Sequence, residues 1–401
     1  MRKIAFFCIP AHGHTNPTLE VVKELIQQGH EVRYYSYNCM KEKIISTGAK
    51  YISCDAYDFE QKLEPADGKR IAEDMSFAME VLVNSTLAMD EALLEDVKQW
   101  RPDCIVADSM ALWGKLIAQK LDVPFVSSTT TFAFNRYSSK VMQGSLKDLF
   151  KVMLQMGKSK KHIKRLQENG YPIKSVLDII QNDNDTNTIV YTSLEFQPYS
   201  ETFSDKYVFV GPSIRPAKGK IEKTREKLIY ISMGTVNNDM ISFYKKCIMA
   251  LKDTSYQVIL SVGNQIDIEA LKQFVQRLHA RGDFLIIPNI DQIAVLKEAD
   301  AFLTHCGMNS VSEALYYKVP LVMFPQTNEQ KGVAFRVEEL GAGVYLKDSS
   351  QECILEALEI ILSNSNYKEG AMKISESFHQ CTGSKAAVEK ILSVANRTNV
   401  W

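Results

Sequence analysis

Apolar and polar residues follow two distinct patterns along the chain. Short apolar runs rich in β-branched and aromatic residues are typical of buried strands, and the longer segments between them carry apolar residues at helical spacing. In the first half, the expected strands are residues 3–9, 31–37, 50–54, 103–108 and 124–129. Helices are expected at residues 15–29 and within residues 67–100. Strands that alternate with helices predict parallel sheets covered on both faces, which is the α/β class.

The same alternation starts again after a segment rich in proline, glycine and charge. In the second half, the expected strands are residues 227–234, 256–263, 284–289, 301–307, 320–325 and 342–346. We therefore expect two Rossmann-like, doubly wound domains of similar size, one over residues 1–210 and one over residues 227–382. Residues 211–226 would form the linker between them, and residues 383–401 would form a last helix.

Composition narrows the class of protein. With 401 residues and a hydrophobic fraction of 45%, the chain is long enough for two or three domains with large cores. Its formal net charge is -1, so it lacks the basic excess typical of nucleic-acid binding. The eight cysteines have no paired spacing, and no apolar stretch is long enough to span a bilayer. We expect a soluble, cytoplasmic protein that binds no nucleic acid and is a monomer or a homodimer.

A histidine and an aspartate follow two strands that should be neighbours. His14 lies in the loop after the first expected strand, and Asp108 ends the fourth. In the common strand order 3-2-1-4-5, these strands are adjacent at the crevice where ligands bind, so the two side chains should face each other. Such an imidazole accepts a proton from a hydroxyl while the carboxylate fixes its tautomer. The alternative is that both residues only cap helices, the first of which would begin near Asn16 and Pro17.

The neighbouring His12 raises a different hypothesis. Two histidines spaced as HxH after a first strand can begin a metal site in barrel hydrolases, but that site needs further ligands at later strand ends. Among the remaining histidines, only His305 follows an expected strand. We therefore expect no metal site.

Residues 301–330 hold the densest group of polar residues in the chain. A strand ends at His305, a glycine turn follows at Gly307, and a helix starts around Asn309. The N–H groups and the positive dipole end of such a helix bind phosphate. Glu313 lies one turn along the same face, where a carboxylate suits the paired hydroxyls of a ribose.

Two common nucleotide-binding motifs are absent from the sequence. No GxGxxG follows a first strand and no GxxxxGK[ST] occurs, which disfavours dinucleotide and P-loop sites. The loop after the first strand of the second half, ISMGT, offers another glycine turn with the hydroxyl of Thr235 nearby. Either loop alone also fits an ordinary strand-to-helix turn. Together they favour a nucleoside diphosphate held by backbone dipoles and side-chain donors.

Four stretches resemble the GT-B inverting glycosyltransferases that use UDP-sugars, in particular the bacterial macrolide and natural-product branch. They are HGHTNPTLEVVKELIQQGHEV, DCIVADSMALWG, ISMGT and the run from DQIAVL to FPQTNEQ, and they span essentially the whole chain. The run HCGMNSVSEAL followed by VPLVMFPQTNEQ is the most specific. The resemblance implies an acceptor-binding N-terminal domain, a donor-binding C-terminal domain, a reaction in the cleft between them and a last helix that crosses back onto the first domain.

The resemblance also implies roles for single residues. His14 would deprotonate the acceptor hydroxyl, and Asp108 would orient His14. The implied donor-binding residues are His305, Gly307, Asn309, Ser310 and Thr235 for the diphosphate, Glu313 for the ribose, Gln292 near the base, and Glu329 and Gln330 at the sugar hydroxyls. No metal and no cofactor beyond the UDP-sugar co-substrate is implied.

One position departs from the family pattern. The family usually has a tryptophan in a WxPQ motif that stacks on the uracil, whereas the aligned residues here are NIDQ, with Asn289 in the tryptophan position. Because an asparagine has no aromatic face, this position does not identify the base; UDP remains favoured from the resemblance, and TDP stays open. Glu329 and Gln330 stand where plant members frequently have Asp-Gln, which favours glucose without fixing the sugar.

The leading hypothesis is a metal-independent, inverting UDP-glycosyltransferase that moves a hexose, with glucose favoured, to a hydroxyl of an apolar acceptor such as a macrolide or a flavonoid. Met110, Trp113, Phe132 and Phe134 would line the acceptor pocket, although such residues more often belong to a core. One alternative is a UDP-sugar epimerase on the same fold, against which the HGHTNP stretch argues. The other is a non-catalytic nucleotide-sugar-binding protein, in which the histidine and aspartate pair would have no purpose.

Overall fold

The structure, a computed structural model, forms two compact units. It describes residues 1–55, 70, 74–135, 137, 160–171, 173–175, 185–234 and 240–396. The first unit comprises Met1–Ser213 and Cys381–Trp401, and the second unit comprises Ile214–Gln380. Within the described ranges, no helix is both long enough and apolar enough to cross a bilayer.

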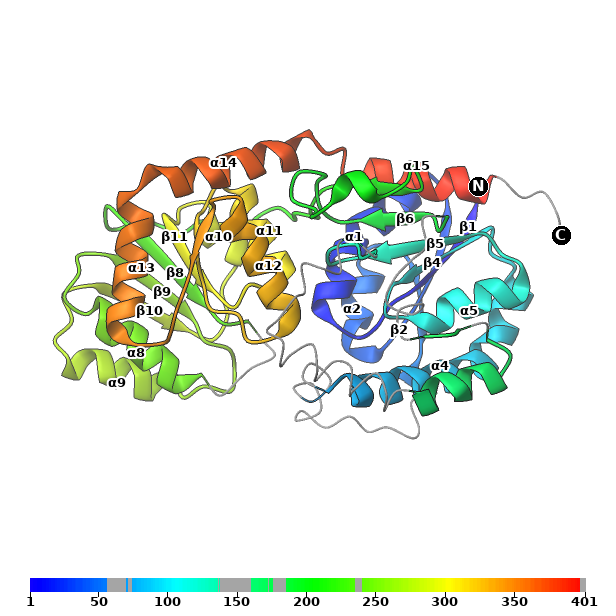
Figure 1. Cartoon of the computed structure of the whole chain (residues 1–401), viewed down its shortest axis with the longest axis horizontal. Helices are drawn as coiled ribbons and strands as arrows, with labels where there is room; N and C mark the ends of the chain where they lie inside the picture. The colour runs from blue at the N-terminus through cyan, green and yellow to red at the C-terminus, as the bar shows by residue number, and fades with distance from the viewer. Residues whose placement is uncertain are drawn as a thin grey trace. The chain divides into compact units, whose positions relative to one another are not determined.

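The first unit is built on a parallel sheet of seven strands (Figure 1). The strands are β1 (Lys3–Phe7), β2 (Glu31–Ser36), β3 (Lys50–Ser53), β4 (Cys104–Asp108), β5 (Phe125–Thr129), β6 (Thr188–Val190) and β7 (Tyr207–Phe209). Their order is β3-β2-β1-β4-β5-β6-β7, so β1 lies between β2 and β4, as the sequence predicts. The register pairs Phe6 of β1 with Tyr34 of β2 and with Val106 of β4.

Helices cover both faces of this sheet. They are α1 (His12–Gln27), α2 (Lys41–Ile45), α4 (Met75–Trp100), α5 (Leu112–Leu121), α15 (Ser384–Ala395), the 3-10 helices η1 (Asn38–Met40) and η4 (Ser200–Thr202), and a helical stretch at residues 160–168. Side chains along β1 alternate between the two faces. Ile4 and Phe6 pack with α1 and α15, whereas Ala5 and Phe7 pack with α4 and α5. Both faces are therefore buried, which explains why the strands read as continuous apolar runs.

The last helix, α15, belongs to the first unit although it ends the described chain (Figure 1). Its residues Ala387, Val388 and Ile391 are fully or almost fully buried in the same cluster as Ile4 of β1. Arg2 donates a hydrogen bond from Nη2 to Oδ1 of Asn396 at 2.8 Å. The chain thus leaves the first unit after Ser213 and returns to complete its core.

The second unit is built on a parallel sheet of six strands in the order β10-β9-β8-β11-β12-β13. The strands are β8 (Leu228–Ser232), β9 (Gln257–Ser261), β10 (Asp283–Ile287), β11 (Ala301–Thr304), β12 (Leu321–Met323) and β13 (Gly343–Tyr345). The helices are α8 (Ile241–Leu251), α9 (Ile268–Arg277), α10 (Gln292–Leu296), α11 (Met308–Tyr316), α12 (Asn328–Glu339), α13 (Gln351–Ser363) and α14 (Ser365–Gln380). Two doubly wound parallel sheets confirm the predicted α/β class. Strand order reverses between β8 and β11, where such sheets bind ligands.

Most of the segment predicted as a linker, residues 211–226, is attached to the second unit. Lys223 donates from Nζ to Oδ2 of Asp300 at 2.7 Å, and Thr224 donates from Oγ1 to Oδ2 of Asp283 at 2.7 Å. The second unit accordingly begins at Ile214. The composition of the segment is that of a linker, but Lys223 and Thr224 are paired with carboxylates at the amino ends of β11 and β10.

Candidate active site

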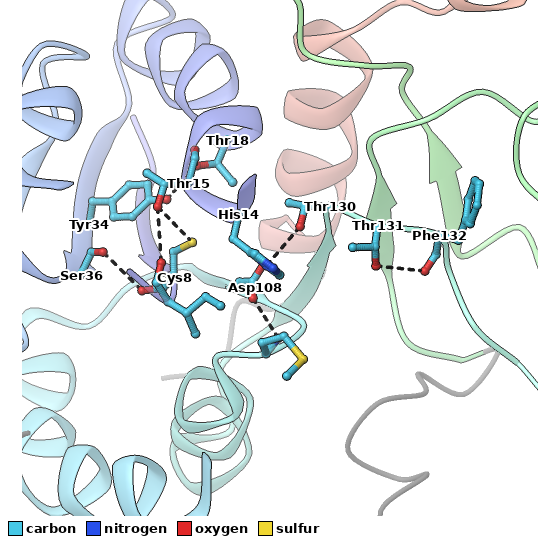
Figure 2. A network of polar contacts seen from close by, with 12 residues as sticks. Cys8, His14, Thr15, Thr18, Tyr34, Ser36, Asp108, Thr130, Thr131 and Phe132 are labelled. Atoms are coloured by element: carbon cyan, nitrogen blue, oxygen red, sulfur yellow. Dashed lines mark hydrogen bonds and ion pairs between the residues drawn. The ribbon is translucent and has the colours of Figure 1, made fainter. Parts of the chain in front are cut away.

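His14 lies in the first turn of α1, close to the carboxyl end of β1 (Figure 2). The sequence predicts a helix start near Asn16 and Pro17, and this is wrong, because α1 begins at His12 and carries Pro17 inside it. Two buried contacts hold this end of the helix against the sheet. Thr18 Oγ1 lies 2.7 Å from the hydroxyl of Tyr34 on β2, and Thr15 Oγ1 lies 3.6 Å from Cys8 Sγ.

The imidazole of His14 contacts residues at the ends of two further strands (Figure 2). Its Nδ1 lies 2.8 Å from Oδ2 of Asp108, the last residue of β4, and 3.1 Å from Oγ1 of Thr130, which follows β5. The side chain of Asp108 is fully buried and that of His14 is 20% exposed. Because β1, β4 and β5 are adjacent and parallel, their carboxyl ends bring the three residues to one edge of the sheet.

This arrangement suits proton abstraction by His14. A carboxylate only accepts, so a hydrogen bond at 2.8 Å requires the proton on Nδ1 of the neutral ring. The lone pair is then on Nε2, and Asp108 stabilises the imidazolium that forms when Nε2 takes a proton. The other carboxylate oxygen of Asp108 accepts from the backbone N–H of Met110 at 2.9 Å, which fixes the orientation of the carboxylate.

The alternative that both residues only cap helices does not fit His14, and it fits Asp108 only in part. The N-cap of α1 is Ala11, which makes no side-chain capping bond, so His14 is not the cap of that helix. Asp108 does bond the backbone two residues ahead, as an aspartate at a turn commonly does. Its second oxygen still contacts His14, so local turn formation does not account for the pair.

His12 has a cation as its neighbour. Lys43 Nζ lies 3.1 Å from Nδ1 of His12, and burial together with this ammonium lowers the pKa of His12. A positive charge at that distance opposes the binding of a metal ion. Over the part of the chain that the structure describes, no three His, Cys, Asp or Glu side chains are grouped as metal ligands.

His305 lies at the point where strand order reverses in the second unit. It directly follows β11 and stands between two glycines: a Cβ atom on Gly234 would lie 2.6 Å from the ring, and one on Gly307 would lie 2.7 Å from Nε2. Burial lowers the pKa of His305 to about 4, so the ring is neutral at physiological pH. Its Nδ1 is buried and makes no hydrogen bond within the described residues. A neutral, confined ring of this kind can donate one hydrogen bond to an anion.

The N-terminus of α11 follows His305. Gly307 is the N-cap and makes no side-chain capping bond, and Asn309 and Ser310 lie in the first turn. No acidic residue lies in that turn, so nothing in it opposes the binding of a phosphate.

Gln292 and Glu313, which the sequence assigns to the base and the ribose, are in direct contact. Gln292 Nε2 lies 2.5 Å from Oε2 of Glu313 and 3.3 Å from Oγ of Ser310. The hydroxyl of Tyr230 donates to the amide oxygen of Gln292 at 3.3 Å. Burial raises the pKa of Glu313, although Gln292 and Arg215 oppose that rise. The second unit therefore combines a helix N-terminus, a neutral histidine and a buried carboxylate at one end of its sheet.

Comparison with known proteins assigns the chain to a family. A family model described as "UDP-glucoronosyl and UDP-glucosyl transferase" matches residues 223–383. The chain is 32% identical to a Bacillus subtilis protein named "Uncharacterized UDP-glucosyltransferase YojK", over 99% of this chain and 98% of that protein. It is 33% identical to the NDP-glycosyltransferase YjiC of Bacillus licheniformis, over 97% of each. The chain belongs to the UDP-glycosyltransferase family.

The fold of this UDP-glycosyltransferase agrees with that of solved members. CalG4, the calicheamicin glycosyltransferase, superposes with a TM-score of 0.80 at 25% identity, over 100% of both chains. The predicted GT-B fold is thereby confirmed, as is the prediction that the protein is an enzyme of this class.

The other three residues predicted to bind the donor are Thr235, Glu329 and Gln330. Thr235 lies outside the described residues. Glu329 is exposed in the first turn of α12. Gln330 closes a capping box, in which its Oε1 accepts from the backbone N–H of Thr327 at 3.2 Å and Thr327 Oγ1 accepts from the N–H of Gln330 at 3.3 Å. Gln330 thus stabilises the start of α12, and only its amide nitrogen could serve a sugar hydroxyl.

The predicted acceptor residues divide into two groups. Trp113 is 2% exposed and packs in the cluster between the first sheet, α4 and α5, and Phe132 is 4% exposed and lies against Phe196. Packing accounts for both. Met110 and Phe134 are half-buried. Thr130, in contact with His14, was not predicted, and no sequence pattern distinguishes it from the threonines on either side.

Proposed function

We propose that this UDP-glycosyltransferase moves a hexose, glucose first among the candidates, from a UDP-sugar to a hydroxyl of an apolar natural product, with inversion and without a metal. The observation that carries the proposal is the 2.8 Å contact between His14 Nδ1 and the buried carboxylate of Asp108. The names of relatives support the two substrates: YojK is named a UDP-glucosyltransferase, and CalG4 is named for calicheamicin, a natural product.

The proposed reaction is a single displacement. His14 Nε2 takes the proton of the acceptor hydroxyl as that oxygen forms a bond to the anomeric carbon of the sugar. The bond from this carbon to the diphosphate oxygen breaks, and UDP leaves with the electron pair. Attack opposite the leaving group inverts the carbon, so an α-linked donor gives a β-glycoside. Asp108 would stabilise the imidazolium. This stabilisation is part of the roughly 10²–10⁴-fold rate increase that a general base provides.

The proposed donor contacts stabilise the charge that the leaving group gains. The N–H groups at the start of α11 and the neutral ring of His305 would bind the diphosphate, and Glu313 would accept from the ribose hydroxyls. These hydrogen-bond donors would neutralise the diphosphate, as a divalent cation does in other glycosyltransferases. We therefore expect sugar transfer to persist when a chelator removes divalent cations.

The nucleobase is the part of the donor with the least defined contacts. Asn289 is exposed, and its Nδ2 donates to Oδ1 of Asn264 at 2.7 Å. This amide pair offers hydrogen bonds in place of an aromatic face. We propose UDP as the principal donor nucleotide, with TDP as the competing one, and titration of both against the protein decides between them.

His14→Ala, with His12→Ala as its matched control, tests the proposed function. The first variant should lose about 10²–10⁴-fold in kcat while it binds UDP with unchanged affinity. The control removes the neighbouring histidine, which contacts Lys43 and not Asp108, and should keep its activity. Transfer is measured by mass spectrometry with UDP-glucose and a panel of macrolide and phenolic acceptors, and UDP binding by calorimetry. An unchanged kcat in His14→Ala would overturn the assignment of the base.

A further inference from the structure

The carboxylate of Asp291 is bound by the segment through which the chain enters the second unit. Asp291 Oδ1 accepts from the guanidinium of Arg215, and Oδ2 accepts from the backbone N–H of Lys218 at 2.6 Å. Both oxygens are therefore occupied by residues that precede Asp291 by more than seventy positions. The side chain of Asp291 is 17% exposed and that of Arg215 is 41% exposed, so the ion pair is largely buried on its carboxylate side and open to solvent on its guanidinium side.

Asp291 is the N-cap residue of α10, and the first residue of that helix is Gln292. The amide of Gln292 connects α10 to two other elements. It contacts Glu313 and Ser310 on α11 and accepts from Tyr230 on β8. A shift at Asp291 must pass to Gln292, because the two residues are covalently adjacent. The position of Arg215 is thus linked to that of the Gln292 amide through two covalent or hydrogen-bonded steps.

Arg215 also acts on Glu313 through its charge. Glu313 is buried, and burial disfavours its carboxylate form, which the proposed ribose contact requires. The guanidinium favours the carboxylate, whereas the charge of Asp291 opposes it. The net influence of the pair on Glu313 therefore depends on how the guanidinium and the carboxylate are placed relative to it.

We propose that the Arg215–Asp291 ion pair positions Gln292 and Glu313 for the nucleotide, so that Arg215 is a positioning residue of the donor site. The inference rests on the proposed function, since it assigns these two residues to the base and the ribose. The sequence analysis assigns no role to Arg215 or to Asp291, although Asp291 lies in the NIDQ stretch, where it occupies the position of the proline in the WxPQ motif.

The decisive experiment measures UDP binding by calorimetry in the full-length protein. Arg215→Gln should weaken UDP affinity by about three- to thirtyfold, the range typical of a residue that acts on a site through its neighbours. Lys223→Gln is the matched control, because it breaks the Lys223–Asp300 pair that fastens the same segment at a distance from Gln292. The control should lose similar thermal stability and bind UDP as the wild type does. Arg215→Lys should recover part of the affinity.

Steady-state kinetics and a double variant separate positioning from general damage. Arg215→Gln should raise the donor KM and leave kcat at saturating donor and the acceptor KM unchanged. If Arg215 acts on Gln292 through Asp291, the double variant Arg215→Gln/Asp291→Asn should weaken UDP binding no more than Arg215→Gln does alone. Wild-type UDP affinity in Arg215→Gln, or an equal loss in Lys223→Gln, overturns the inference. A wild-type protein that binds no UDP refutes the proposed function instead, and the titration of the wild type shows this before any variant is compared.

Discussion

Alanine at position 307 should displace the ring of His305. Gly307 has a φ of -61°, which any residue adopts, so the substitution Gly307→Ala introduces no backbone strain. The added Cβ would lie 2.7 Å from Nε2 of His305, whereas ordinary contacts begin at 3.4 Å. On the other side, the ring already occupies the space that a side chain on Gly234 would fill. The ring must therefore move, or the helix start must move with it.

The expected loss follows from these distances. A displacement of about 0.7 Å is enough to break a hydrogen bond from the ring to a phosphate oxygen, because charge-assisted bonds need about 2.7–2.9 Å. Such a bond contributes about 1.5–3 kcal/mol. At 1.4 kcal/mol for each tenfold change, UDP affinity should fall by about 10- to 100-fold. Overpacking should also lower the free energy of unfolding by about 1–3 kcal/mol.

Calorimetric titration with UDP and thermal unfolding test the reasoning. Gly332→Ala is the control, because a Cβ on this glycine of α12 meets nothing within 4 Å and should only favour the helix. The double variant Gly307→Ala/His305→Ala should bind UDP as His305→Ala does if the methyl group acts through the ring. If Gly307→Ala binds UDP with wild-type affinity, the position of His305 does not matter for the nucleotide.

Three further predictions concern single residues. Asp108→Asn should lower kcat by about 10²–10⁴-fold with UDP affinity kept, because an amide that donates to Nδ1 selects the wrong tautomer of His14; a near-normal kcat would exclude that role. Asn289→Trp should raise UDP affinity about tenfold by restoring a stacking face, and an unchanged titration would show that the base lies elsewhere. Because burial lowers the pKa of His305 from 6.5 to about 4, the unfolded chain takes up this proton first, so the free energy of unfolding should fall as pH falls from 6.5 to 4. Denaturant titrations of His305→Gln should show a smaller decrease in the free energy of unfolding over the same pH range.

Much of the fold was readable because a parallel sheet buries both faces of its strands. The apolar runs at residues 103–108 and 301–307 correspond to β4 and β11, and the expected adjacency of β1 and β4 correctly predicts the contact between His14 and Asp108. β6 and β7 were not predicted because only the short 3-10 helix η4 lies between them, so they break the strand–helix alternation; β12 and β13 are equally short but flank α12. The start of α1 was misplaced because a proline suggests the first helical residue, yet here it lies inside the helix.

The site was less readable where it depends on contacts between distant segments. The pair of Arg215 and Asp291 joins residues 76 apart, and their types and local surroundings are those of ordinary surface charges. The structural role of Gln330 is different, since Thr327-x-x-Gln330 is the sequence signature of a capping box and could have been recognised. The burial of Trp113 could not have been recognised from the sequence, because the sequence around an aromatic residue after a strand is the same whether that residue packs in a core or lines a pocket.

The return of α15 makes the first unit discontinuous in sequence, with the second unit inserted into it. During synthesis, β1 and its neighbours emerge from the ribosome long before α15, so the part of the sheet face that α15 covers beside α1 stays open until residues 384–395 have been made. A chain that stops before Ser384 would leave the apolar surface beside Ile4 exposed to chaperones and proteases. Ile214–Gln380, in contrast, is one uninterrupted stretch and can fold as soon as it has been made.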